Sequence, residues 1–224
     1  MREDAVETGT VAGIDVGGAR KGCHMVILRG TSILSNVRRM TPAEMLRECL
    51  KFDVKAVGID APCRWAEAGS GRLAERELAR QHIHCFATPT QEQAKSSPSG
   101  FYDWMLCGEL VYHAFAAAYP LLNDREYEGN RVTFETFPHA IACSVLGRET
   151  VSAKRKLVER RKLLETVGIN PLPLRSIDSI DAALCAWTAG RLVAGHARSY
   201  GDAAGGYIHV PDSAGQRCNP NRLA

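Results

Sequence analysis

Two aspartates end apolar runs that share the spelling G-I-D. Asp15 closes "VAGID" (residues 11–15), and Asp60 closes "AVGID" (residues 56–60). A buried, ionised carboxylate without a partner is costly, so such residues are usually paired, neutralised or bound to a metal ion. An Asp at this place can instead cap a turn through a hydrogen bond to the backbone. The pattern therefore predicts a carboxylate site and leaves the capping role as its alternative.

Three further acids could join the same site. Glu135 ends a third apolar run, "RVTFE", while Asp178 and Asp181 stand three residues apart in "SIDSID" and so share one face of a helix. Glu135 could instead hold a surface Lys or Arg, and Asp178 could cap the helix. Carboxylates are the ligands that Mg²⁺ and Mn²⁺ prefer, and two such ions can cleave a phosphodiester. The predicted catalytic residues are Asp15, Asp60, Glu135 and Asp181, with Asp178 as a further metal ligand.

Hydrophobic patterning predicts the elements that must position these acids. Strands are expected over residues 10–18, 22–30, 31–39, 54–62 and 130–140, and helices over 41–52, 64–81, 102–120, 152–168 and from 176 onward. Residues 88–100 are expected to form a mobile loop. Three strands joined by short Gly-containing turns, followed by strand–helix alternation, favour a mixed sheet over a doubly wound one. Parallel central strands would place Asp15, Asp60 and Glu135 at one end of that sheet.

Basic residues cluster in two of the predicted helices. Arg64 and Arg76 follow the second acid, and Lys154 and Arg155 begin a run of basic residues near the third. Side chains of this kind can bind the phosphates of DNA or RNA. A solvated amphipathic helix gives the same pattern, so these four residues are candidate substrate contacts with a structural alternative.

Bulk properties agree with one ordinary globular domain. The 224 residues carry a formal net charge of +3, which permits an anionic partner without demanding one. Eight scattered cysteines, a charged N-terminus and no apolar run of membrane-spanning length predict a cytoplasmic protein without a membrane association. We expect one domain over residues 1–224, with a core at 10–195 and a partly irregular tail at 201–224. A homodimer is compatible with this composition.

Several motifs resemble a known family. The acids on the first strand, a later strand and the last helix resemble those of the RNase H-like superfamily. More narrowly, "GIDVGG", "GIDAP", "TFETFPHA" and "IDAALCAWTA" are similar to the domain of unknown function 429 family, described as predicted RNase H-like nucleases. The resemblance spans roughly residues 10–195. It implies an α/β fold with a five-stranded sheet in the order 3-2-1-4-5, strand 2 antiparallel, flanked by helices with a helical insertion.

The same resemblance implies metal-dependent nuclease chemistry. The acids that match its motifs are Asp15 on the first strand, Asp60 in the second motif, Glu135 of "ETFP", and the pair Asp178 and Asp181, which resembles the paired C-terminal acids of Holliday-junction resolvases. One departure concerns the first helix, where RNase H supplies an acid. Glu44 and Glu48 on that helix have no motif around them, and neither is assigned to the site.

Two other functions remain open from the sequence. "GIDVGGARKG" resembles the phosphate-binding hairpin of sugar kinase and actin-like phosphotransferases, although a second Gly-rich phosphate loop is missing from the sequence. A non-catalytic module could keep the fold and bind nucleic acid or a protein partner. The full set of acids favours the nuclease over both.

Overall fold

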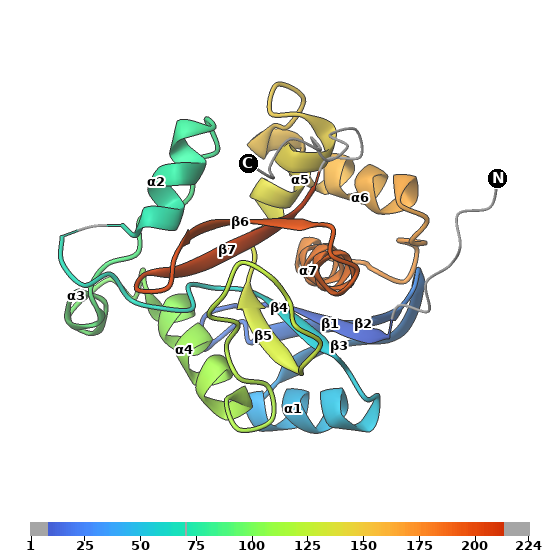
Figure 1. Cartoon of the computed structure of the whole chain (residues 1–224), viewed down its shortest axis with the longest axis horizontal. Helices are drawn as coiled ribbons and strands as arrows, with labels where there is room; N and C mark the ends of the chain where they lie inside the picture. The colour runs from blue at the N-terminus through green and yellow to red at the C-terminus, as the bar shows by residue number, and fades with distance from the viewer. Residues whose placement is uncertain (1–8, 70, 213–224) are drawn as a thin grey trace, which may run out of the picture.

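A single mixed β-sheet organises the chain in the computed structural model, which describes residues 9–69 and 71–212. Seven strands follow the order β3-β2-β1-β4-β5-β7-β6 (Figure 1). Their bounds are β1 (Thr10–Asp15), β2 (Cys23–Arg29), β3 (Ser32–Met40), β4 (Ala56–Asp60), β5 (Val132–Glu135), β6 (Ala197–Asp202) and β7 (Gly206–Pro211). The predicted order 3-2-1-4-5 is confirmed, and β2 is antiparallel to both of its neighbours. The sheet is larger than predicted by two strands.

Helices cover both faces of this sheet. They are α1 (Pro42–Lys51), α2 (Leu73–Arg80), α3 (Gln91–Lys95), α4 (Asp103–Phe115), α5 (Pro138–Leu146), α6 (Lys156–Thr166) and α7 (Ile177–Val193), with a 3₁₀ turn at Ala153–Arg155. In Figure 1, α1 and α4 lie on one side of β1 and β4, and α5, α6 and α7 lie on the other. The helix starts carry the expected signals, since Thr41 and Ser176 each cap a first turn with the side-chain oxygen.

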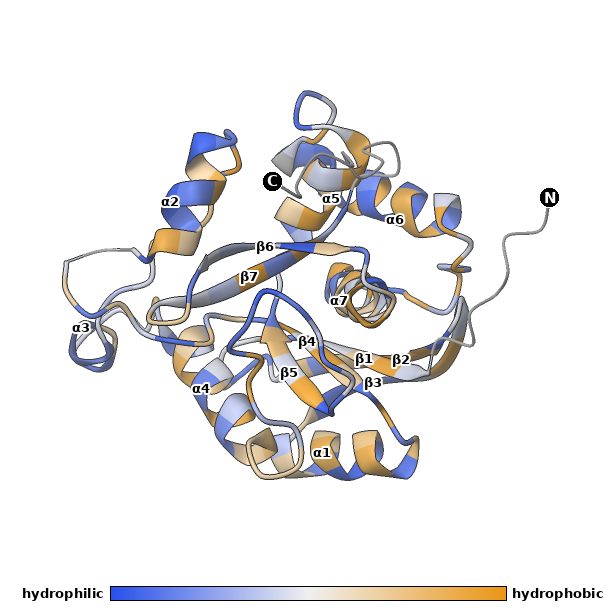
Figure 2. Ribbon diagram, in the orientation of Figure 1, coloured by the Kyte–Doolittle hydropathy of each residue, from blue (hydrophilic) through white to orange (hydrophobic). Residues whose placement is uncertain are grey.

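Alternating side chains of β1 fill two separate cores. Ile14 packs with residues of α1 and α4, whereas Val11 packs with residues of α7 on the opposite face. Such alternation is the period-2 signature of a strand that is buried on both faces. Figure 2 shows the corresponding distribution, with apolar residues over much of α7 and a mixed surface on α2 and α6.

The two G-I-D motifs gain a physical explanation from α7. A Cβ atom on Gly13 would overlap the backbone of Ala182 and Ala186, and one on Gly58 would lie 2.7 Å from the carbonyl oxygen of Cys185. Only glycine therefore allows α7 to rest this close to β1 and β4. Because side chains alternate along a strand, the aspartate two residues later faces the same helix. Each motif thus combines a glycine on which α7 packs closely with a carboxylate that faces the same helix.

The tail that was predicted to be partly irregular from residue 201 forms a β-hairpin as far as Pro211, so this prediction was wrong for residues 201–211. Its Gly and Asp residues serve the turn, where Asp202 Oδ1 accepts a hydrogen bond from the Gly205 amide at 2.7 Å and Gly206 has a φ of +82°. β7 then pairs in parallel with β5. The remainder of the predicted tail, residues 213–224, lies outside the described residues.

Two predicted helical boundaries also differ. The helix expected over residues 64–81 begins only at Leu73, because Gly71 has a φ of +85°, which a helix cannot contain. The expected loop at 88–100 contains α3, whose first turn is capped by the Thr90 hydroxyl accepting from the Gln93 amide. Among the helices that the structure describes, none is long and apolar enough to cross a membrane.

Candidate metal centre at the carboxyl end of the strands

Strand register brings the first two predicted acids side by side. Asp15 is the last residue of β1, and its Cα partner on the parallel strand β4 is Asp60. On the antiparallel side, Asp15 is the partner of His24 of β2. Neighbouring strands lie about 4.8 Å apart. Three side chains able to bind a metal ion therefore stand in one row across the sheet.

The N-terminus of α7 adds the two helical acids. Ser176 is the N-cap of this helix, so the alternative in which Asp178 caps it does not apply. Asp178 lies in the first turn, where the partial positive charge of the helix favours a carboxylate. Asp181 follows one turn later and is only 6% exposed. The structure thus brings together four of the five predicted acids: Asp15, Asp60, Asp178 and Asp181.

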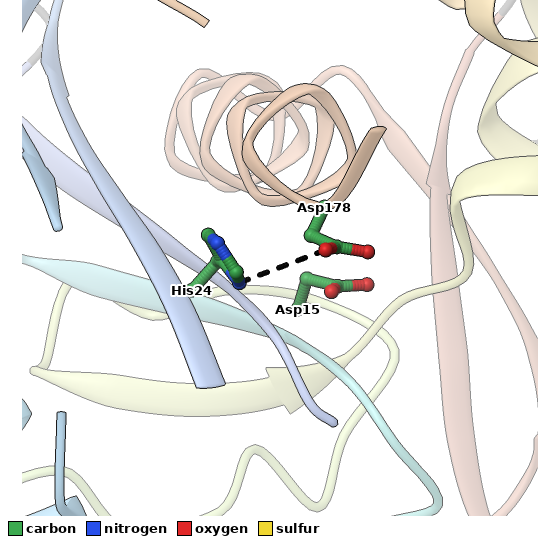
Figure 3. Close-up of side chains that lie close together, drawn as sticks. All are labelled: Asp15, His24 and Asp178. Atoms are coloured by element: carbon green, nitrogen blue, oxygen red, sulfur yellow. Dashed lines mark ion pairs between the residues drawn. The ribbon is translucent and has the colours of Figure 1, made fainter. Parts of the chain in front are cut away.

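Asp15, His24 and Asp178 form the tightest group (Figure 3). One ligand atom of each lies within 4.8 Å of the other two. In the described part of the chain, Asp15 Oδ2 and His24 Nδ1 are buried and have no hydrogen-bond partner. Lys21 Nζ donates a hydrogen bond to Asp178 and lies 4.0 Å from Asp15 Oδ2. These two buried atoms, together with the Asp178 carboxylate, are suitable ligand atoms for a divalent cation.

The charges of this cluster perturb one another. Burial, followed by the Asp181 charge, raises the pKa of Asp15 to about 7. Burial and then the Asp15 charge raise the pKa of Asp60 well above its usual value. Burial lowers the pKa of His24, so its imidazole is neutral at pH 7 and can act as a ligand. A bound cation would relieve the repulsion between the carboxylates.

Arg160 of α6 contacts the remaining acid of the group. Its Nη1 donates to both carboxylate oxygens of Asp181 at 2.5 Å, and the Arg160 side chain is itself buried. Burial raises the pKa of Asp181, and the Arg160 charge opposes that effect. Asp181 therefore has a close, buried counterion, whereas the Lys21 ammonium that faces Asp15 is half-exposed and lies 4.0 Å away.

Glu135 lies on the neighbouring strand and belongs to a different ion-pair network. Arg72 donates to its two oxygens at 2.7 and 2.6 Å, and the Cys63 amide donates to Oε2 at 2.8 Å. Arg72 also pairs with Glu75 at 2.8 Å, and all three charged side chains are buried. This is the ion-pair alternative that the sequence left open for Glu135, with a buried arginine in place of a surface one. Its role as a metal ligand stays a prediction.

The four predicted phosphate contacts form hydrogen bonds or ion pairs elsewhere, or are exposed. Arg64 donates to Asn123 at 2.7 Å, and Arg76 donates to the carbonyl of Gly71 at 3.2 Å. Lys154 and Arg155 are exposed just before α6, where Arg155 pairs with Glu159 at 3.2 Å. None of these contacts is with the carboxylate cluster. Their binding of phosphate stays a prediction.

A small hollow of about 40 Å³, open to solvent, adjoins the cluster. Asp60 and Glu135 line it from the strand ends, and Arg72 and Glu75 from the buried ion-pair network. Apolar walls come from Phe86, from Trp104 in α4 and from Phe137 in the turn between β5 and α5. A bound molecule in this hollow would therefore have a carboxylate of the candidate site at its edge.

The predicted site residues do not include His24, Lys21, Arg160 or Arg72, although the sequence places both arginines among basic residues that could bind phosphates. His24 carried a usable signal, since it is the only polar residue within the buried stretch "CHMVIL" of β2. Its approach to Asp15 depends on the register of the β1–β2 hairpin, which the sequence does not fix. The two arginines lie 21 and 63 positions from their partners in the sequence, and only the folded chain shows such contacts.

The fold is an α/β fold whose mixed sheet contains the order 3-2-1-4-5 and is extended by a β-hairpin, and it places a row of acids at the strand ends. A model of the family described as "Protein of unknown function (DUF429)" matches residues 13–204, so the chain belongs to this family. None of the curated proteins is similar enough to count as a match.

Two solved structures resemble the chain. They are the RuvC structure from Thermus thermophilus (14% identity, TM-score 0.43) and T. thermophilus RuvC in complex with a Holliday junction substrate (16% identity, TM-score 0.41). The alignments cover 84% and 85% of this chain, respectively, and 98% of each RuvC chain. At these identities and TM-scores the similarity assigns no residue role and no substrate to the present protein.

Proposed function

We propose that this protein is a metal-dependent nuclease that hydrolyses phosphodiester bonds at the Asp15–His24–Asp178 cluster. The observation that carries the proposal is the pair of buried, unpartnered atoms, Asp15 Oδ2 and His24 Nδ1, facing the Asp178 carboxylate. Leaving such atoms without a partner costs about 1–3 kcal/mol each. A divalent cation would satisfy both atoms and neutralise the carboxylates.

Two carboxylates and one neutral imidazole would hold the ion. An imidazole ligand favours Mn²⁺ over Mg²⁺, which prefers an all-oxygen shell, and Asp60 would supply a further oxygen from the adjacent strand. The ion, when bound, supplies Lewis-acid activation of water and phosphate.

The other side chains have supporting tasks. Lys21 neutralises Asp178 in the metal-free protein, and its side chain is 53% exposed, so it is free to exchange this contact for a substrate phosphate. Arg160 fixes the orientation of Asp181 behind the cluster. The hollow beside Asp60 gives a substrate access to the reacting end of the strands.

The proposal is tested by cleavage and by metal binding. Wild type, Asp15→Asn, His24→Ala and the control Asp53→Asn are incubated with single-stranded and duplex DNA, RNA, an RNA–DNA hybrid and a four-way junction, with Mn²⁺ or Mg²⁺. Asp53 is an exposed acid that pairs with Lys55 and Arg131 away from the cluster, so its variant makes the same chemical change elsewhere.

We expect the wild type and the control to cleave at least one substrate and to bind Mn²⁺ with the same affinity in calorimetry. Asp15→Asn should abolish cleavage and His24→Ala should weaken Mn²⁺ binding. Cleavage by Asp15→Asn at the wild-type rate, or no cleavage by a wild type that binds no Mn²⁺, would remove the assignment.

A further inference from the structure

Exposed aromatic rings gather beside the candidate metal centre. Phe86 and Phe101 are 62% and 50% exposed, and their ring centroids lie 5.6 Å apart in an edge-to-face arrangement. Phe86 also lies 6.4 Å from the ring centroid of Trp104. Phe86, Phe101 and Trp104 are called the aromatic platform below.

The aromatic platform is held against the strand ends by α4. Trp104 lies in the first turn of this helix, close to Gly18 in the turn after β1. Further along α4, a side chain on Gly108 would lie 2.5 Å from the Cβ of Ala61, the residue after Asp60. Glycine thus permits α4 to pack directly on the chain that carries the carboxylate. Helix α4 therefore holds Trp104 beside the strand ends, and Phe86 and Phe101 adjoin it through the ring contacts described above.

The hollow described above joins the platform to the acids, because Phe86 and Trp104 line it together with Asp60. Its charged lining consists of three acidic side chains and one basic one: Asp60, Glu75, Glu135 and Arg72. Arg72 is already paired with Glu75 and Glu135, so this lining offers a phosphate group no free cation. The part of a nucleotide that suits aromatic walls with an acidic rim is the neutral base, whose amino and imino groups can donate to carboxylates.

We infer that the aromatic platform stacks an unpaired nucleobase next to the phosphate that is cleaved, which makes single-stranded nucleic acid the preferred substrate. This inference rests on the proposed function and narrows its substrate class. Stacking of one base on an aromatic side chain contributes about 1–3 kcal/mol and tolerates any sequence, since every base has a π-face. In a duplex the bases are already stacked on one another and are not available to the platform.

The first experiment measures binding without cleavage. Fluorescence anisotropy in EDTA compares wild type, Phe86→Ala and Leu110→Ala with a labelled single strand, its duplex, and a chain of abasic nucleotides of equal length. Leu110 is a matched control because it is also 62% exposed and lies on α4. We expect Phe86→Ala to weaken single-strand binding about tenfold, with no change for Leu110→Ala. The abasic chain should bind the wild type as weakly as the single strand binds Phe86→Ala.

The inference is overturned if Phe86→Ala and wild type bind the single strand with equal affinity. It is also overturned if the wild type binds the abasic chain as tightly as the single strand, or if its binding to the single strand is undetectable. Failure of the nuclease proposal is scored separately, by cleavage with Mn²⁺. Base-dependent binding through Phe86 without any cleavage would leave the platform standing and remove the nuclease. Cleavage by the wild type with no effect of Phe86→Ala on binding would support the nuclease and overturn the role of the aromatic platform.

Discussion

Asp15→Asn is expected to stabilise the metal-free protein even though it removes a metal ligand. Asp15 is 7% exposed, and burial together with the Asp181 charge raises its pKa from 3.8 to about 7. An acid whose pKa is higher in the folded state favours folding only while it is protonated. Stability is therefore lost as the pH rises from 3.8 toward about 7, the window set by this shift. Asparagine has the shape of the neutral acid and carries no charge, so the variant escapes this loss.

The size of the effect follows from the two pKa values. One pKa unit corresponds to about 1.4 kcal/mol, so ionisation of Asp15 costs the folded state about 4 kcal/mol at about pH 8. At about pH 5 the unfolded chain is mostly ionised at this position while the folded state is not, and the cost falls to about 2 kcal/mol. The variant should gain stability by about these amounts relative to the wild type.

The assay is urea unfolding in EDTA at both pH values, with Asp53→Asn as the control. The exposed Asp53 carboxylate accepts hydrogen bonds from Lys55 and Arg131, which lower its pKa, so its replacement should bring no gain at either pH. The reasoning is refuted if Asp15→Asn is no more stable than the wild type at about pH 8. It is equally refuted if the gain is the same at both pH values, since a titrating carboxylate cannot produce a constant difference.

Three further predictions test the fold around the site. His209 is fully buried, and burial lowers its pKa to about 4, so the wild type should lose about 3 kcal/mol of stability as the pH falls from 6.5 to 4; His209→Leu should remove that slope in urea unfolding, and parallel pH profiles would contradict this. Arg72→Met should cost about 3–5 kcal/mol by leaving Glu135 buried without its counterion, and adding Glu135→Leu should recover part of the loss in the same measurement. Gly13→Ala should lower the thermal midpoint because its methyl group would overlap the backbone of α7. Gly190→Ala should instead raise stability by about 0.5–1 kcal/mol, since its new methyl group meets only ordinary contacts at 3.8 Å. Equal thermal midpoints for the two variants would contradict the close packing of α7 on β1.

The sequence contained enough information for the arrangement of the central strands. The repeated G-I-D spelling marked two strands and their carboxylates, and the pairing of Asp15 with Asp60 follows from parallel neighbours of equal register. Apolar periodicity and the serine before "IDSID" located α7. These features are local, or they follow from the rules of sheet topology.

Other parts of the site depend on contacts that no local pattern encodes. The ion pair between Glu135 and Arg72 requires the segment between β4 and β5, which carries Arg72, to fold back over the strand ends. The place of His24 depends on hairpin register, which shifts with a single residue in the turn. The β6–β7 hairpin was missed because its Gly- and Asp-rich turn has the same composition as an irregular tail.

The packing of α7 on β1 determines when the acidic cluster can form during synthesis of the chain. Asp15 is synthesised 163 residues before Asp178 (178 minus 15). At about 5–20 residues per second, the first strand waits roughly 10–30 s for the helix that covers it. During that interval Gly13 and Gly58 face no helix, and the apolar residues on that face of the sheet remain uncovered. An unfinished chain therefore holds only the strand-end half of the acidic cluster, and the cluster is complete only when synthesis has passed residue 181.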